Sequence, residues 1–516
     1  MSKNLDFKAY NAFDLSHEHK FTCDMGELIP CLTREVVPGD IWRIDAKVFA
    51  RLIPQIAPFM HQVDIFTHFF FVPNRLVNPD WEEFITKGFS GTSVVPWSYV
   101  EAPSGGFTKY SVYDYMRLPT GIAGIQVDAM PIRGYYLICN EWYTNENVQT
   151  YTTIGTSTGQ DTTTPGTIMK RNWQSDYFTG ALPWAQRGNP VYLPLGTSAP
   201  VYAGADIPSG LYPQDPVKIV NAANGTLSST AIGLMARQTT GYMTASNASV
   251  TPASANNWVF GNLNADLTQA TSATINDIRV AFQVQRWMEK NARGGVRYIE
   301  FLLSHFGEKS SDERLQRPEY LGGGRSFFVT SEVLQTSSTD STSPQGNMAG
   351  HSYSGQKTMS MTRRFEEFGW IYCILSVMPR TQYQQGIERQ WSRKTPLDYY
   401  FPSFAHLGQQ AILNQELYAQ GTSADAGVFG FQDRFEELRT IPNGVSGDFR
   451  DTLDYWTMTR KFNSLPQLNS TFVEADPTKR IFAVQNAKTC LIDIGFDIQC
   501  LRKLPKHGTP GLLDHA

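Results

Sequence analysis

Two stretches of this 516-residue chain come close to motifs that do chemistry. Gly350–Ser354 reads GHSYS, whereas the nucleophile turn of serine hydrolases needs G-x-S-x-G, so Ser354 stands where the second glycine belongs. The run Gly322–Gly324 could cradle a phosphate, but the Arg-Ser-Phe-Phe after it is typical of a strand and lacks the Lys-Ser/Thr pair of a phosphate loop. We therefore predict no catalytic serine in the first stretch and a turn with positive φ at the second.

Zinc-binding residue types occur near the N-terminus, where His17 and His19 precede Cys23 and Cys31. Their spacing matches no common structural zinc site, so polar contacts made by an N-terminal arm are the preferred interpretation. Adjacent carboxylates point to different sides of a helix or strand and cannot face each other as acid and base. Three such pairs occur: Asp312-Glu313, Glu366-Glu367 and Glu436-Glu437. The residues thus predict a protein that is not an enzyme, with no catalytic, cofactor-binding or metal-binding residues.

Basic residues gather in three places. Arg286, Lys290, Arg293 and Arg297 follow one another at spacings of four, three and four, which gives one cationic stripe on an unbroken helix. Two further clusters lie later in the chain: Arg460 with Lys461, and Arg502 with Lys503 and Lys506. Either contact with nucleic acid or a solvated face with salt bridges at a subunit contact explains them, and the second explanation is preferred.

The totals exclude several classes of protein. A net charge of -4 excludes packing of nucleic acid by overall charge, so any such contact needs local patches or a separate basic partner. Six cysteines do not make a disulfide framework, and we expect all six to be reduced and mostly buried. The first residues lack the apolar core of a signal peptide, and no apolar run approaches the roughly 18 residues of a membrane helix. We expect a chain that stays in the cytoplasm where it is made, without membrane insertion.

The elements that would position these residues are mainly strands. Ile41–Leu52 and Cys490–Cys500 alternate apolar and polar residues, which predicts two half-buried strands at opposite ends of the chain. Val63–Val72 predicts another strand, and Arg325–Thr330 a shorter one. Trp370–Met378 is almost wholly apolar, which indicates a strand covered on both faces.

Helix is the minority. Asn276–Asn291 predicts a helix so apolar that we expect it to pack between other elements, and Gly294-Gly295 ends it. Tyr298–Phe306 predicts a second helix, and Leu407–Ala419 a third.

Two segments read as insertions. Asn145–Thr274 is too long for a plain connection and is nearly uncharged over much of its length, but its aromatic residues favour an ordered subdomain over disorder. Gln335–Gln356 is a shorter insertion rich in Ser, Thr and Gly.

Short motifs in both ends and the middle of the chain point to one family. In chain order they are Asn11–His17 (NAFDLSH), Gly26–Pro30 (GELIP), Glu35–Asp40 (EVVPGD), Phe69–Leu76 (FFFVPNRL), Tyr298–Leu302 (YIEFL), Ser304–Gly307 (SHFG), Arg314–Gly323 (RLQRPEYLGG), the loop Gln335–His351 and Tyr455-Trp456. Together they resemble the major capsid protein of the Microviridae, small tailless bacteriophages with circular single-stranded DNA, and are most similar to the gokushovirus branch.

The resemblance implies an all-β fold: a single viral jelly roll, an eight-stranded antiparallel β-barrel of two facing sheets with long inserted loops and a few short helices. A jelly roll pairs its first strand with its last, so Ile41–Leu52 should lie beside Cys490–Cys500. It also implies a T=1 icosahedral shell of sixty copies, built through pentamers, around the single-stranded DNA genome. A small, very basic internal protein would neutralise that genome, and a large insertion would form a protrusion at the threefold axes that meets a receptor on the bacterial host.

These implications give an expected division of the chain. Residues 1–37 would be an N-terminal arm and 502–516 a C-terminal tail, both ordered only against neighbouring subunits. Residues 38–144 and 275–501 would form the jelly-roll core with its loops and helices, and 145–274 the protrusion. Inner contacts with DNA are expected among Arg286, Lys290, Arg460, Lys461, Arg502, Lys503 and Lys506. Such a protein would be assembled in the bacterial cytoplasm and reside in the virion.

Two other classes make different predictions. A β-sandwich adhesin or carbohydrate-binding module would carry a secretion signal and remain a stable monomer. A hydrolase on a β-scaffold would need a nucleophile and a base that converge, and the sequence offers neither.

Overall fold

The computed structural model describes residues 10–189 and 275–506 except 335–347, together with residue 191 and six short strands between residues 201 and 265. Contacts divide the chain into two units. The first comprises Met1–Arg187 and Glu289–Ala516, and the second comprises Gly188–Met288.

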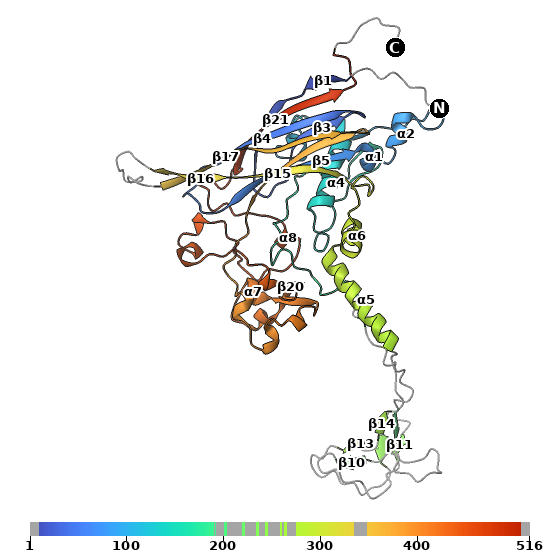
Figure 1. Ribbon diagram of the computed structural model, residues 1–516, viewed down its shortest axis with the longest axis vertical. Coiled ribbons are helices and arrows are strands. Elements are labelled where there is room, and N and C mark those ends of the chain that lie inside the picture. The colour runs from blue at the N-terminus through green and yellow to red at the C-terminus, as the bar shows by residue number, and fades with distance from the viewer. Residues whose placement is uncertain are drawn as a thin grey trace. The chain divides into compact units, whose positions relative to one another are not determined.

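The first unit is built on two antiparallel sheets that face each other (Figure 1). The six-stranded sheet has the order β1 and β2, then β21, β4, β17 and β16. Its strands are β1 (Asn11–Asp14), β2 (His17–Cys23), β21 (Cys490–Arg502), β4 (Ile41–Leu52), β17 (Met348–Arg364) and β16 (Val329–Leu334). The four-stranded sheet has the order β15 (Glu319–Phe327), β5 (Val63–Pro73), β18 (Gly369–Pro379) and β3 (Ile29–Val36).

The chain passes back and forth between these sheets, which makes the fold a jelly roll. β2, β4, β17 and β21 lie in one sheet, while β3, β5, β15 and β18 lie in the other. Both β1 and β2 pair with β21, so the two strands together occupy the first barrel position. The all-β jelly roll expected from the family resemblance is confirmed.

Alternation in the sequence decides which side chains fill the barrel. Trp42, Ile44 and Val48 of β4 are buried, while Arg43 and Lys47 between them are exposed. The same period of two buries alternate residues of β21 from Cys490 to Cys500. These side chains join one core cluster with residues of the four-stranded sheet.

Strand β18 is covered on both faces, as its wholly apolar sequence predicted. Ile371 and Cys373 belong to the barrel core, whereas Tyr372 and Ile374 belong to a second cluster built on α4 (Met130–Ile138). That helix therefore covers the outer face of the four-stranded sheet, where the Tyr372 hydroxyl donates to the carbonyl of Pro131 at 2.8 Å.

The two ends of the chain do lie side by side. Leu52 is the register partner of Cys490 and Ile41 that of Leu501, so the predicted pairing of Ile41–Leu52 with Cys490–Cys500 is confirmed. However, β4 is not the first strand. The expected irregular arm at residues 1–37 is wrong from residue 11 onward, because β1, β2 and β3 lie there. β1 and β2 are half exposed and polar, so their alternation was weak in the sequence.

The helices follow the sequence in part. α5 (Ile275–Gly294) and α6 (Tyr298–Phe306) confirm two predictions, and Gly295, with φ +98°, separates them. The helix predicted over Leu407–Ala419 is wrong. That segment forms β19 (Gln409–Leu413), which pairs with β20 (Val428–Asp433), and then a single helical turn, α7 (Asn414–Leu417).

Three smaller expectations need correction. Gly322–Gly324 lies within β15, where a bulge and a φ of +126° at Gly322 replace the expected turn. Strand β17 begins at Met348, so the shorter insertion ends before that residue, and residues 335–347 lie outside the described part. Residues 145–187 belong to the first unit, which buries Trp173 and Phe178, so the separate unit begins at Gly188 and not at Asn145.

The second unit contains three pairs of antiparallel strands and most of α5. They are β9 (Val201–Ala203) with β14 (Leu263–Ala265), β10 (Ile219–Asn221) with β13 (Trp258–Phe260), and β11 (Leu234–Ala236) with β12 (Met243–Ala245).

The first unit completes its loops with short elements. They are α1 (Asn74–Val77), α2 (Trp81–Thr86), β6 (Ser98–Glu101), α3 (Val112–Tyr115), β7 (Gln126–Asp128), a π turn at Cys139–Tyr143, β8 (Gly159–Gln160) and α8 (Ser470–Val473). Single 3₁₀ turns lie at Arg389–Trp391, Pro396–Asp398, Pro402–Phe404, Ser423–Ala426, Glu436–Leu438, Gly447–Arg450 and Asp454–Trp456.

Candidate assembly surfaces

Helix α5 exposes apolar side chains, contrary to the expectation that it packs between other elements. Its exposed apolar residues are Ile275, Val280, Phe282, Val284 and Trp287, of which Ile275 and Phe282 are 71% and 70% exposed. Among the residues of α5 only Ala292 is buried. A solvated helix carries polar residues on its outer side, so an apolar one indicates contact with another protein surface.

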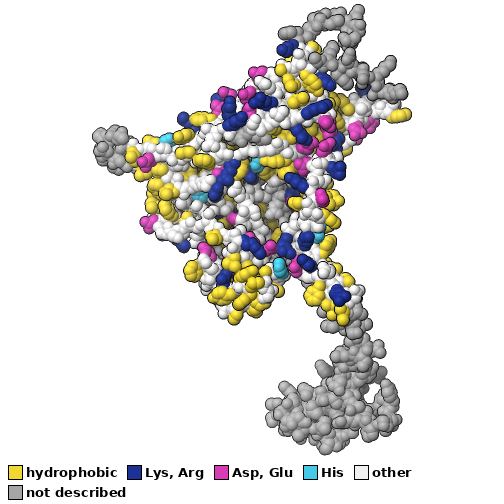
Figure 2. All heavy atoms as spheres, viewed as in Figure 1, with side chains coloured by type: hydrophobic (Ala, Val, Ile, Leu, Met, Phe, Trp, Pro, Cys, Tyr) yellow, Lys and Arg dark blue, Asp and Glu magenta, His cyan; other side chains and the backbone are white. Residues whose placement is uncertain are grey.

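A second apolar surface lies on the segment from Ile387 to Ile441, where Figure 2 shows hydrophobic side chains gathered at the lower edge of the first unit. Trp391 is 75% and Ile441 84% exposed. The other large apolar side chains exposed there are Ile387, Leu397, Tyr399, Tyr400, Phe401, Leu407, Val428 and Leu438. Aromatic residues of this kind are enriched in the buried centres of protein interfaces.

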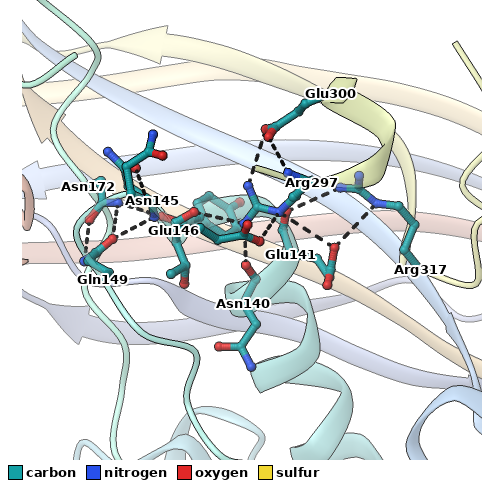
Figure 3. A network of polar contacts seen from close by, with 12 residues as sticks. Asn140, Glu141, Asn145, Glu146, Gln149, Asn172, Arg297, Glu300 and Arg317 are labelled. Carbon is teal, nitrogen blue, oxygen red and sulfur yellow. Dashed lines mark hydrogen bonds and ion pairs between the residues drawn. The ribbon is translucent and has the colours of Figure 1, made fainter. Parts of the chain in front are cut away.

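Arg297, at the junction of α5 and α6, fastens that junction to the end of α4 (Figure 3). Its Nη2 donates to the carbonyl of Asn140 at 2.7 Å, and its Nε lies 3.0 Å from the Glu146 carboxylate. Its backbone N–H donates to Glu300 Oε2 at 3.0 Å, which caps α6. The Arg297 side chain is only 15% exposed, so its removal would leave partly buried groups unpaired and would cost more than the loss of a surface ion pair. Burial raises the pKa of Glu146, and Arg297 opposes that rise.

A second guanidinium extends this network. Arg317 Nη2 donates to the carbonyl of Glu141 at 3.3 Å, and its Nε lies 3.5 Å from the Asp312 carboxylate. The same group sits over the ring of Trp142, 4.3 Å from its centroid. The Arg297–Arg317 network thus holds the start of α6 and the approach to β15 against the end of α4.

A pocket of about 440 Å³ is lined by Tyr177, Phe178, Glu416 of α7 and residues 440–446, among others. Two of its carboxylates, Glu416 and Glu437, form ion pairs with Arg389 and Arg393. Glu416 Oε1 accepts from Arg389 Nη1 at 3.0 Å, and Glu416 Oε2 accepts from the Tyr177 hydroxyl at 2.8 Å. Burial raises the pKa of Glu416.

The motifs noted in the sequence serve structural roles. Ser352 is 2% exposed on the core side of β17 and accepts a hydrogen bond from Gln55 Nε2 at 2.9 Å. His17 and His19 hydrogen-bond the carbonyls of Leu15 and Cys31 at 2.8 and 2.9 Å, and burial lowers the pKa of both imidazoles. In the described ranges, no group of three His, Cys, Asp or Glu side chains could hold a metal ion. All six cysteines are free and buried, as predicted.

The seven basic residues expected to touch DNA do not form one site. Arg286 and Lys290 are exposed on α5, and Lys506 is exposed near the end of the described chain. Lys503 lies over the ring of Tyr10, 5.3 Å from its centroid. Lys461 forms an ion pair with Asp454 at 2.6 Å.

The other two are engaged inside the first unit. Arg460 Nη2 donates to the backbone carbonyl of Phe472 at 2.8 Å, and the Arg460 guanidinium lies 4.2 Å from the centroid of the Phe472 ring. The Nε of Arg502 donates to both carboxylate oxygens of Asp40, at 2.9 and 3.0 Å. Neither partner could be found from the sequence. Asp40 is distant from Arg502 along the chain, and Phe472 accepts through its backbone carbonyl, which any residue has.

A family model described as capsid protein (F protein) matches residues 8–512. The chain belongs to the capsid protein family of the Microviridae. It is 37% identical to capsid protein VP1 of Chlamydia phage 1, over 97% of this chain and 95% of the relative. It is also 37% identical to capsid protein VP1 of Bdellovibrio phage phiMH2K, over 96% and 94% of the two chains. It is 32% identical to that of Spiroplasma virus 4, over 95% and 93%.

Membership in the Microviridae capsid family confirms the family resemblance seen in the motifs, with relatives from the gokushovirus branch. It identifies a major capsid protein of the virion, which is a structural protein and not an enzyme. In the part of the chain that the structure describes, no helix is both long and apolar enough to cross a membrane.

Proposed function

We propose that sixty copies of this chain close into a T=1 icosahedral shell around a circular single-stranded DNA genome. The observation that carries the proposal is the apolar surface of α5 in a chain of the capsid family. Such a surface is stable only when covered, and closed point-group symmetry covers the same surface on every copy. The aromatic surface around Trp391 and Ile441 supplies a second area of the same kind.

The proposal assigns the outer surface to the insertion. We propose that the second unit, Gly188–Met288, forms the protrusion at the threefold axes and meets a receptor on the bacterial host. Its division from the jelly roll as a compact unit supports this role, because segments outside a barrel tolerate changes in sequence better than the barrel strands do. The Arg297–Arg317 network supports it as well, since it fixes the point where the chain returns from the insertion.

The charge of the chain requires a further partner inside the shell. A subunit with a net charge of -4 does not neutralise a packaged genome, so the proposal includes a small, very basic internal protein. Assembly would take place in the bacterial cytoplasm, with pentamers as intermediates.

The test is the size and shape of the assembled protein. The full chain, expressed in bacteria, should give closed particles of about 3.5 MDa in light scattering and electron microscopy, as sixty subunits require. Phe282→Glu, which charges the 70% exposed side chain on α5, should leave folded subunits or pentamers that no longer close.

Gln283→Glu is the matched control, because it adds the same charge to the next exposed residue of the same helix. Shells should form from this variant. A monomeric wild-type chain, or shells formed equally by both variants, would contradict the proposed role of α5.

A further inference from the structure

The open face of the six-stranded sheet is divided by charge. Over β4 and β17 it carries five cations and one carboxylate: Arg43, Lys47, Arg51, Lys357 and Arg364, with Asp45. Over β1, β2 and β21 it carries four carboxylates and one cation: Asp14, Glu18, Asp493 and Asp497, with Lys20. Figure 2 shows Lys, Arg, Asp and Glu side chains along the edge that this sheet forms.

The basic half contains an arrangement that is unfavourable in an isolated sheet. Lys47 and Lys357 are direct register partners on neighbouring strands, and like charges placed opposite each other destabilise a sheet. Asp45 relieves part of this repulsion, since it pairs with Lys357 at 2.8 Å. Among the described residues, no carboxylate lies within ion-pair distance of Lys47 or Arg51. An anion over this half of the sheet would be attracted by all these charges.

Two aromatic rings stand among these cations. Phe49 and Tyr353 are each 45% exposed and occupy diagonal positions on β4 and β17, because Tyr353 is opposite Arg51. Gly355, opposite Phe49 on β17, places no side chain beside the ring there, whereas the register partner of Phe49 on β21 is Asp493. The Arg51 guanidinium lies 5.3 Å from the Phe49 ring centroid. Exposed rings flanked by Lys and Arg are the combination with which proteins hold unpaired bases and their phosphates.

The geometry points to a binding site for single-stranded DNA on the β4–β17 half of this face, with Phe49 and Tyr353 stacking on bases and Lys47, Arg51 and Lys357 contacting phosphates. The inference rests on the proposed function. In Figure 1 the four-stranded sheet lies between the six-stranded sheet and α6, so the chain leaves the barrel for the insertion on the side away from this open face. With α6 on the outer side of the shell, the open face turns toward the enclosed genome.

The test is the binding of fluorescent oligo(dT) to full-length, unassembled subunits, followed by anisotropy at several salt concentrations. The double variant Phe49→Ala with Tyr353→Ala, which removes two stacking rings, should weaken binding by about 30-fold or more, with little change in its salt dependence. Lys47→Gln with Arg51→Gln should reduce the slope of log K against log salt by about 1.4, the value for two lost phosphate contacts on a single strand.

Two control variants lie on the same face. Leu491→Ala removes a 44% exposed apolar side chain without an aromatic ring, and Lys20→Gln removes a cation that is paired with Glu18 and Asp493. Both should bind oligo(dT) like the wild type. Unchanged binding by the ring and charge variants would overturn the inference. Equal affinity for duplex DNA of the same length would overturn it too, since paired bases cannot stack on the rings.

Shell formation by the same variants separates this inference from the proposed function. Particles that close but carry less DNA, read from the ratio of absorbance at 260 and 280 nm, are the expected result. Variants that fail to close while binding oligo(dT) normally would identify the face as a contact between subunits and overturn the inference. Absence of shells from the wild type would overturn the proposed function while leaving the oligonucleotide result to be judged alone.

Discussion

At the scale of single residues, Asp40 is the most heavily used polar group of the barrel. It is 1% exposed, and it accepts from Trp42 Nε1 at 3.1 Å and from the backbone N–H of Val37 at 3.1 Å. Arg502 completes the set with its paired hydrogen bonds to the carboxylate. The residue therefore joins the start of β4 to the end of β21, and Arg502 belongs to the barrel and not to a tail.

Arg502→Gln should destabilise the subunit, because it leaves the buried Asp40 carboxylate without its counter-charge. The loss should be about 3 kcal/mol in the free energy of unfolding, the low end for a broken buried pair since Arg502 is 24% exposed. Urea denaturation of unassembled subunits measures it. Lys503→Gln is the control and should change stability by less than about 0.5 kcal/mol; an equal loss in both would contradict this account of Arg502.

Two half-buried histidines make stability depend on pH. Burial lowers the pKa of His61 and of His68 to about 4. At His61 the backbone N–H of Met458 donates to Nδ1 at 3.3 Å while Nε2 lies 2.7 Å from the carbonyl of Arg380, so the neutral ring fits both partners. An unfolded chain binds these protons near pH 6.5, whereas the folded chain does so only near pH 4.

Unfolding should therefore become easier as pH falls from 6.5 toward 4, and stability from these groups should be fully present above pH 6.5. His61→Asn should show a shallower fall than the wild type between pH 6.5 and 5, in urea denaturation at each pH. His351→Asn, which changes an exposed histidine, should keep the wild-type slope. A wild-type chain with no fall over this range would contradict the assignment of neutral, half-buried rings.

At the scale of elements, the junction of α5 and α6 depends on one guanidinium. Arg297→Ala removes the guanidinium that lies between the carboxylates of Glu141 and Glu146. It also removes two hydrogen bonds to backbone carbonyls at the end of α4. We expect a loss of about 2 kcal/mol and faster hydrogen exchange in residues 289–306, with the barrel strands unchanged. Arg293→Ala, at a 43% exposed arginine, is the control and should alter neither. Equal exchange in both variants would show that Arg297 does not anchor the junction.

The elements that could be predicted from the sequence are those in which burial on one face imposes a period. The apolar alternation of β4 and β21 and the continuous apolar run of β18 gave their positions correctly. β1 and β2 were missed because half of their side chains face water and the other half include histidines. The segment Leu407–Ala419 has residues that suit a helix, but pairing with β20 decides its structure, and that partner is not visible locally.

The surfaces were harder to predict than the core. Helix α5 was placed correctly, but it was expected to pack against other elements of the same chain, and it is exposed. The sequence does not say whether the surface that covers an apolar helix belongs to the same molecule. The cations of β4 were visible as the outer side of an alternating strand. Their grouping with Lys357 and Tyr353 required the register of β17, which is set by a bulge after Lys357.

At the scale of the whole molecule, the basic half of the six-stranded sheet and the apolar surfaces proposed for contacts between copies lie on different elements. The subunit carries a net charge of -4, yet one half of one sheet face is basic. The exposed apolar residues that we assign to contacts between copies lie on α5 and around the β19–β20 pair, in elements outside the barrel sheets. A shell protein needs this separation, because contacts between copies and contacts with a genome should not compete for the same residues.

The position of β21 between β2 and β4 also sets the order of events during synthesis. The strand that occupies the middle of the first sheet is made by the ribosome after nearly all the rest, so β2 and β4 must wait for it with open edges. A chain broken off before residue 490 lacks the strand that joins its neighbours and cannot complete the barrel. We therefore expect particles to take up only chains that have been translated through β21.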